Sequence, residues 1–197
     1  MSDPATPFDP QAGGPAFTVA NKAERVLWRT CWLLLARWTP PPLFAWRAAL
    51  LRLFGAQVGA GARVYGSASI WLPRNLSLGE RAVVGPGAIL YNQGRISIGA
   101  RSVISQRAHL CASTHNVHDP HFALEMRPTT VEPGCWVAAE AFVGPGVRMA
   151  AGAVLGARGA LFTDAEPMAI YRGNPAVRIG TRHWRGAAEA EPVTSRR

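Results

Sequence analysis

The chain has 197 residues and a formal net charge of +9, with 17% charged and 48% hydrophobic residues. This size and composition are typical of one folded unit with a small appendage and exclude a disordered chain. The basic charge suits an anionic membrane surface or a phosphate-bearing ligand. The sequence carries no helix-turn-helix, zinc-finger or RNP-type motif, so we expect no nucleic-acid partner.

The first segment, residues 1–20, is rich in Pro, Gly and Ala, and we expect it to be flexible. It lacks the basic start and apolar core of a signal peptide, which indicates a cytoplasmic protein. The three cysteines, Cys31, Cys111 and Cys135, have no metal-binding spacing. They are expected to be buried or free thiols in a reducing compartment.

Residues 21–55 predict two amphipathic helices. Asn21 and Glu24 have the spacing of a capping box, Pro40 to Pro42 stop the first helix, and Gly55 ends the second. Trp and Arg alternate along both helices, and neither is long enough to span a bilayer. Two interpretations stay open: the pair covers the open end of the following domain, or residues 25–54 bind the inner face of the cell membrane as a peripheral anchor.

A six-residue period dominates residues 56–180, where an inward-type aliphatic residue recurs and a Gly or small residue usually follows it. This period fits neither an α-helix nor simple strand alternation, but it predicts an all-β fold, a parallel β-helix with one short strand and one turn per hexapeptide. The aliphatic positions are Val58, Val64, Ile70, Leu76, Leu78, Val84, Leu90, Ile96, Ile98, Ile104, Leu110, Val131, Val137, Val143, Met149, Leu155 and Leu161. Residues 181–197 form a basic C-terminal tail.

The period is lost at residues 111–130, which predicts a protruding loop on the functional face. His115, His118 and His121 lie in it, and His109 lies just before it. His115, where the loop leaves the coil, is the candidate general base, and it needs a single carboxylate or carbonyl to hold it. A zinc site, ordinary exposed loop histidines, and Cys111 as a nucleophile with His115 as its base remain alternatives.

Besides the period, four segments occur in a characteristic order: Ser113–Pro120, Gly134–Ala139, Val143–Val147 and Gly173–Ala176. In this order they resemble the left-handed β-helix acyltransferases, and in particular the branch of acetyltransferases in the biosynthesis of colanic acid and other extracellular polysaccharides. That branch is similar to the maltose, galactoside and nodulation-factor O-acetyltransferases. The resemblance implies a left-handed coil, a homotrimer with sites between subunits, and direct acetyl transfer from acetyl-CoA to a sugar hydroxyl. The acceptor is expected to be a polysaccharide building block or a lipid-linked oligosaccharide, and the basic, Trp-rich N-terminal helices suit the latter. No metal is required for this chemistry.

Site residues follow from the same resemblance, position by position. It implies that His115 is the general base and that Asn92 positions the acceptor or stabilises the oxyanion, although an Asn in a tight turn is an equal alternative. The residues implied for acetyl-CoA are Trp136, Ala139, Ala157, Arg178 and Arg182.

The chain departs from the family pattern near its end. Thr163 stands where a Lys is common, and Val177 stands where an Arg or Lys is common. Arg158 is a candidate to supply the missing charge. Two alternative functions use the same fold: a β-helix scaffold without catalysis, and a zinc-dependent γ-class carbonic anhydrase.

Overall fold

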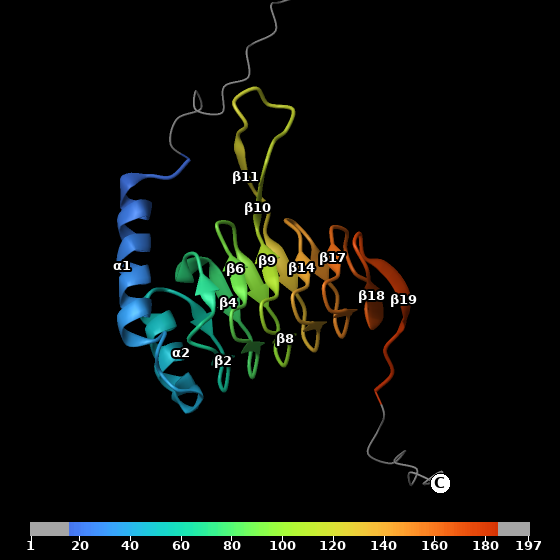
Figure 1. Cartoon of the computed structure of the whole chain (residues 1–197), viewed down its shortest axis with the longest axis horizontal. Helices are drawn as coiled ribbons and strands as arrows, with labels where there is room; N and C mark the ends of the chain where they lie inside the picture. Colours follow the sequence, from blue (N-terminus) through green and yellow to red (C-terminus); the bar gives the residue numbers. More distant parts are fainter. Residues whose placement is uncertain (1–15, 185–197) are drawn as a thin grey trace, which may run out of the picture.

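The computed structural model describes residues 16–184, which form a pair of helices followed by a long coil of short strands (Figure 1). The helices lie at one end of the coil, and one hairpin projects from its side. The predicted flexible segment 1–20 and basic tail 181–197 fall mostly outside the described residues. Of those two segments, Val19 and Ala20 belong to the first helix and Thr181 to the last strand.

The two helices are α1 (Val19–Leu35) and α2 (Phe44–Leu53), with a 3₁₀ turn at Pro41–Leu43 between them. Among residues 16–184, no helix is long and apolar enough to cross a membrane. α1 ends at Leu35, five residues before Pro40, so the predicted stop at Pro40–Pro42 is not what ends the helix. Gly55 has a φ of +86°, the left-handed conformation expected of the residue that follows a helix.

The predicted N-cap of α1 is wrong. The helix begins earlier than expected, because the Thr18 hydroxyl accepts a hydrogen bond from the backbone N–H of Asn21 at 3.2 Å. Asn21 is therefore the third helical residue and not the cap. Glu24 does not close a capping box but forms an ion pair with Arg74 at 2.9 Å.

The coil is built of three parallel sheets, and the chain visits them in turn. The first and third sheets have five strands each, so the chain completes five coils. The first sheet holds β1 (Gln57–Val58), β4 (Leu76–Leu78), β7 (Ile96–Ile98), β12 (Thr129–Val131) and β15 (Arg148–Met149). The second holds β2 (Arg63–Val64), β5 (Val83–Val84), β8 (Val103–Ile104), β13 (Trp136–Val137), β16 (Val154–Leu155), β18 (Ala169–Arg172) and β19 (Val177–Thr181). The third holds β3 (Ser69–Ile70), β6 (Ile89–Tyr91), β9 (His109–Cys111), β14 (Phe142–Val143) and β17 (Ala160–Leu161).

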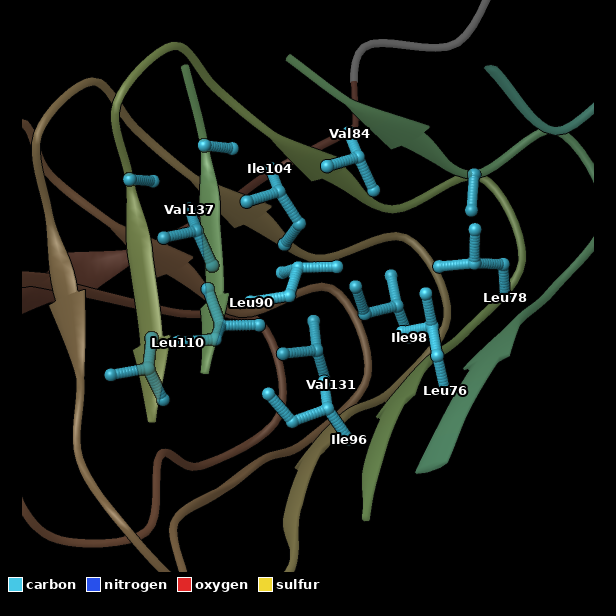
Figure 2. Packing of buried hydrophobic residues seen from close by; sticks show 14 of the residues in the cluster. Leu76, Leu78, Val84, Leu90, Ile96, Ile98, Ile104, Leu110, Val131 and Val137 are labelled. Atoms are coloured by element: carbon cyan, nitrogen blue, oxygen red, sulfur yellow. The ribbon is translucent and has the colours of Figure 1, made fainter. Parts of the chain in front are cut away.

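The predicted aliphatic positions form the core of the coil (Figure 2). In the third sheet, Leu90 pairs with Ile70 on one side and with Leu110 on the other, and its own exposed fraction is 1%. Burying such a side chain contributes roughly 1.5–3 kcal/mol to folding. The breaks in the period also have a structural reason: Leu76 and Leu78 both point inward, so the additional residues lengthen strands of the first sheet.

The glycine that follows several inward residues is required by close backbone approach. A Cβ atom on Gly79 would lie 2.3 Å from the backbone nitrogen of Ala100 in the next coil. A Cβ atom on Gly99 would lie 2.4 Å from the nitrogen of Pro133. Real side chains do not tolerate these distances. Glycine is therefore required where the corners of successive coils stack, which explains the recurring aliphatic–Gly pair.

The last coil ends in an antiparallel pair, β18 and β19. The sequence did not predict this change of direction. The connection between the two strands carries a cis peptide bond between Asn174 and Pro175.

Candidate active site

The interruption of the coil is a hairpin, β10 (Ser113–His115) and β11 (Leu124–Met126), joined by a turn. It leaves the third sheet directly after β9 and projects beyond the coil (Figure 1). Its base is more regular than the predicted loop, because three residue pairs join the two strands. The last of these pairs joins His115 to Leu124, so the hairpin itself fixes the backbone of His115.

The His115 imidazole is held on two sides by Phe122. Its Nδ1 lies 2.7 Å from the backbone oxygen of Phe122, and its ring stacks on the Phe122 ring with a centroid distance of 4.4 Å and an interplanar angle of 9°. A carbonyl oxygen only accepts hydrogen bonds, so Nδ1 carries the proton in the neutral ring. Nε2 then keeps its lone pair, as a proton acceptor requires.

The other loop histidines are not gathered with His115. His118 and His121 are exposed, and their backbone N–H groups donate to the side chains of Asn116 and Asp119. Among residues 16–184, no three His, Cys, Asp or Glu side chains converge as metal ligands.

His109 lies on β9, just before the hairpin, on the outer face of the third sheet. Its ring contacts Tyr91 and Phe142 edge to face, with centroid distances of 6.3 and 5.2 Å. Burial lowers the pKa of His109 below its ordinary value, so the neutral ring is favoured. This residue belongs to a column of aromatic side chains that follows the sheet from Trp71 to Phe162.

Trp136 lines an open groove of about 890 Å³ on the second sheet, together with Arg182 and Trp184. Its side chain is 45% exposed, and its indole N–H donates to the Ser105 hydroxyl at 2.9 Å. The Arg182 guanidinium lies 3.8 Å from the Trp184 ring centroid and donates to the backbone oxygen of Gly134. The structure therefore brings two of the predicted acetyl-CoA residues, Trp136 and Arg182, to one surface.

Ala139 and Ala157 lie at the next corner, between the second and third sheets. The two corners lie one above the other in successive coils, because the backbone oxygen of Ala139 accepts a hydrogen bond from the backbone nitrogen of Arg158, the residue after Ala157, at 2.9 Å. Beside them the carboxylate of Glu140 binds both Arg107 and Arg158. The hydrogen bond from Arg158 is the main cause that lowers the pKa of Glu140. Arg158 is thus already paired, and this cluster of two cations and one carboxylate keeps one excess positive charge.

Arg178 is not part of the groove. It lies on β19, where it forms an ion pair with Glu166 at 3.2 Å and donates to the Thr181 hydroxyl.

Asn92 is fully buried at the end of β6. Its Oδ1 accepts from the backbone nitrogens of Trp71 and Leu72 at 2.9 and 3.2 Å, and its Nδ2 donates to the oxygen of Leu72 at 2.6 Å. These bonds favour the turn-forming alternative over direct contact with an acceptor.

All three cysteines are unpaired. Cys111 donates to the backbone oxygen of Ser113 at 3.2 Å, and no contact within the described residues joins its sulfur to His115. Burial raises the pKa of the Cys135 thiol. Cys135 therefore lacks the setting of a nucleophile, which needs a stabilised thiolate.

Solved structures of similar shape come from acetyltransferases. A galactoside acetyltransferase in complex with coenzyme A matches with a TM-score of 0.77 and 19% identity, over 90% of this chain and 92% of its own. The hexapeptide-repeat acetyltransferase VCA0836 of Vibrio cholerae O1 biovar eltor, complexed with acetyl-CoA, matches with a TM-score of 0.76 and 16% identity, over 86% and 92%. At these low sequence identities, the similarity shows a shared fold and no more.

Sequence similarity decides the family. The chain is 40% identical over 166 residues to the putative colanic acid biosynthesis acetyltransferase WcaF of Escherichia coli strain K12, which covers 84% of this chain and 91% of that protein. This chain belongs to the hexapeptide-repeat acetyltransferases. The predicted left-handed β-helix and the predicted acyltransferase class are thereby confirmed. No family model matches the chain.

Two features of this acetyltransferase were missed from the sequence. Phe122 holds His115, and Trp184 completes the groove with Trp136. Phe122 reaches His115 from the connecting segment of the hairpin, two residues before Leu124, the strand partner of His115, and the irregular loop sequence does not reveal this contact. Trp184 lies in what the sequence indicated as a basic tail.

Proposed function

We propose that this protein transfers an acetyl group from acetyl-CoA to a hydroxyl group of a sugar in a polysaccharide precursor. The observation that carries the proposal is the exposed His115 ring, held through Nδ1 by the Phe122 oxygen so that Nε2 is the proton acceptor. The names of the similar proteins, a colanic acid acetyltransferase and a galactoside acetyltransferase, support a sugar as acceptor.

The proposed chemistry needs one base and no covalent enzyme intermediate. His115 Nε2 removes the proton of the acceptor hydroxyl while the oxygen attacks the thioester carbonyl carbon of acetyl-CoA. The tetrahedral intermediate then collapses, the C–S bond breaks, and the imidazolium returns the proton to the departing thiolate. A base in this position contributes roughly 10²- to 10⁴-fold to the rate.

Acetyl-CoA is proposed to bind along the second sheet, with Trp136 and Arg182 at the groove and the backbone at Ala139 and Ala157 beside the pantetheine. Arg178 is proposed to reach the CoA phosphates by exchanging Glu166 for the ligand. Small side chains at Ala139 and Ala157 leave the backbone accessible, which supports this placement.

We propose that the enzyme is a homotrimer, and the separation of the two halves of the site supports this. His115 extends from the third sheet, whereas Trp136 lies on the second sheet. A neighbouring copy that sets its second sheet beside this hairpin would bring the base and the thioester together. Asn92 is proposed to position the acceptor indirectly, because its side chain holds the turn at Trp71 and Leu72.

The cellular setting is part of the same proposal. We place the enzyme in the cytoplasm, where acetyl-CoA is made, and propose a lipid-linked oligosaccharide at the inner face of the membrane as one form of the acceptor.

The test is a thiol-release assay with the full chain, acetyl-CoA and a panel of sugar acceptors. We expect His115→Ala to lower kcat by at least about a hundredfold while acetyl-CoA binding, measured by calorimetry, is retained. His118→Ala is the matched control, because His118 is exposed in the same hairpin. Equal rates for wild type and His115→Ala would remove His115 from the mechanism.

A further inference from the structure

The helix pair is attached to the coil by one face, which fixes the direction of the other. Trp28 and Trp32 on this inner face are buried, and their indole N–H groups donate to the backbone oxygens of Ile70 at 2.8 Å and Gly66 at 3.0 Å. The Arg47 guanidinium is buried beside them and donates to several backbone oxygens. These directional bonds prevent rotation of the helices, so their outer face stays turned away from the coil.

This outer face is apolar. Of the nineteen large hydrophobic side chains exposed among the described residues, ten lie on the helix pair and its connections. The face is not needed to cover the coil, because Trp28, Leu51 and Ala36 already do so. We call it the outer helix face; its exposed apolar residues are Val19, Val26, Leu27, Leu33, Leu34, Leu35, Trp38, Leu43, Trp46 and Leu53.

The charges around the outer helix face are of one sign. Lys22, Arg29 and Arg37 are exposed and make no ion pair with any described residue. Glu24 is the one acidic residue between positions 16 and 54, and it turns inward to Arg74. An apolar surface edged by unpaired cations fits an anionic surface with an apolar interior.

We propose that the outer helix face binds the surface of an anionic membrane. Leu27, Leu33 and Leu34 enter the boundary between headgroups and acyl chains, and Arg29 and Arg37 contact lipid phosphates. The indoles of Trp38 and Trp46 donate to the backbone oxygens of Leu34 and Leu35, which leaves their rings free to lie at the interface.

A second copy of the chain fits this surface less well. Two such faces in contact would bring Lys22, Arg29 and Arg37 of each copy together, and unpaired like charges repel. The proposal deepens the proposed function, since a membrane-bound enzyme meets a lipid-linked acceptor on a surface, but its test does not depend on catalysis.

The test is co-sedimentation of the full chain with phosphatidylcholine vesicles and with vesicles that also contain phosphatidylglycerol. We expect binding to the anionic vesicles, weakened by salt, and at least about tenfold lower partitioning for Leu34→Glu and for Arg29→Glu. Ile179→Glu is the matched control, because Ile179 is similarly exposed, at 52% against 60% for Leu34, but lies at the far end of the coil. It should bind as wild type does.

Three outcomes would overturn the proposal: no binding of wild type to anionic vesicles, equal binding of wild type and both helix variants, or a concentration-dependent increase in mass without lipid that Leu34→Glu abolishes. The last would assign the face to a second copy. Acetyl transfer to a soluble sugar is measured on the same samples, and Leu34→Glu should retain it. Acetyl transfer without vesicle binding would contradict the membrane proposal alone, whereas vesicle binding without acetyl transfer would contradict the proposed function alone.

Discussion

The coil and the β10–β11 hairpin place their residues by different means. In the coil each inward side chain packs on its counterparts one coil away, as Leu90 does between Ile70 and Leu110. In the hairpin His115 is exposed and depends on one carbonyl and one ring, both of Phe122. The difference separates stability from chemistry: the coil can vary its surface without losing its core, and the hairpin can carry a reactive group without burying it.

Loss of a coil contact is expected to have the largest effect. Leu90→Ala removes a fully buried side chain between two neighbours and should lower the free energy of unfolding by about 2–5 kcal/mol. Ile89→Ala is the control in the same strand, because Ile89 points outward and is 38% exposed. Urea denaturation of both variants checks this, and similar losses for the two would contradict the inward packing of Leu90.

Loss of the ring beneath His115 should have an intermediate effect. Phe122→Ala keeps the backbone oxygen but removes the stacked ring, so the imidazole loses orientation and kcat should fall about tenfold. Phe122→Tyr should restore the rate, and the urea midpoint should not move, because the hairpin lies outside the core. A raised KM with unchanged kcat would show that Phe122 contacts the acceptor and does not position the base.

The smallest expected effect concerns His109, which lies at the foot of the hairpin. Burial lowers its pKa below 6.5, so the folded protein favours the neutral ring while the unfolded chain takes up a proton. Its contribution is fully present above about pH 6.5 and is lost as the pH falls towards the folded pKa. His109→Phe should reduce the loss of Tm between about pH 7 and pH 5 by at most about 4 °C. An unchanged pH dependence would place the acid sensitivity elsewhere.

The sequence predicts the coil well and the site only in part, for a physical reason. Each coil position is set by a short repeat, so the burial of Ile104 or Val137 follows from the period. The His115–Phe122 contact instead depends on the turn of the hairpin, in which Phe122 adopts a φ of +52° that no pattern indicates. At α1, Thr18 and Asn21 are both residues that cap helices well, and the sequence alone does not show that the Thr18 hydroxyl is the one that accepts from the first turn.

The central claim is that the hairpin presents His115 Nε2 as a proton acceptor, and the nitrogen chemical shifts of its ring test it most directly. A long-range ¹H–¹⁵N spectrum of the full chain, with His115→Gln to assign the signals, reports which nitrogen carries the proton in the neutral ring. Protonated Nδ1 with unprotonated Nε2 is the result we predict, because Nδ1 donates to the Phe122 oxygen. The opposite tautomer would contradict this mode of anchoring and the role of His115 as the base.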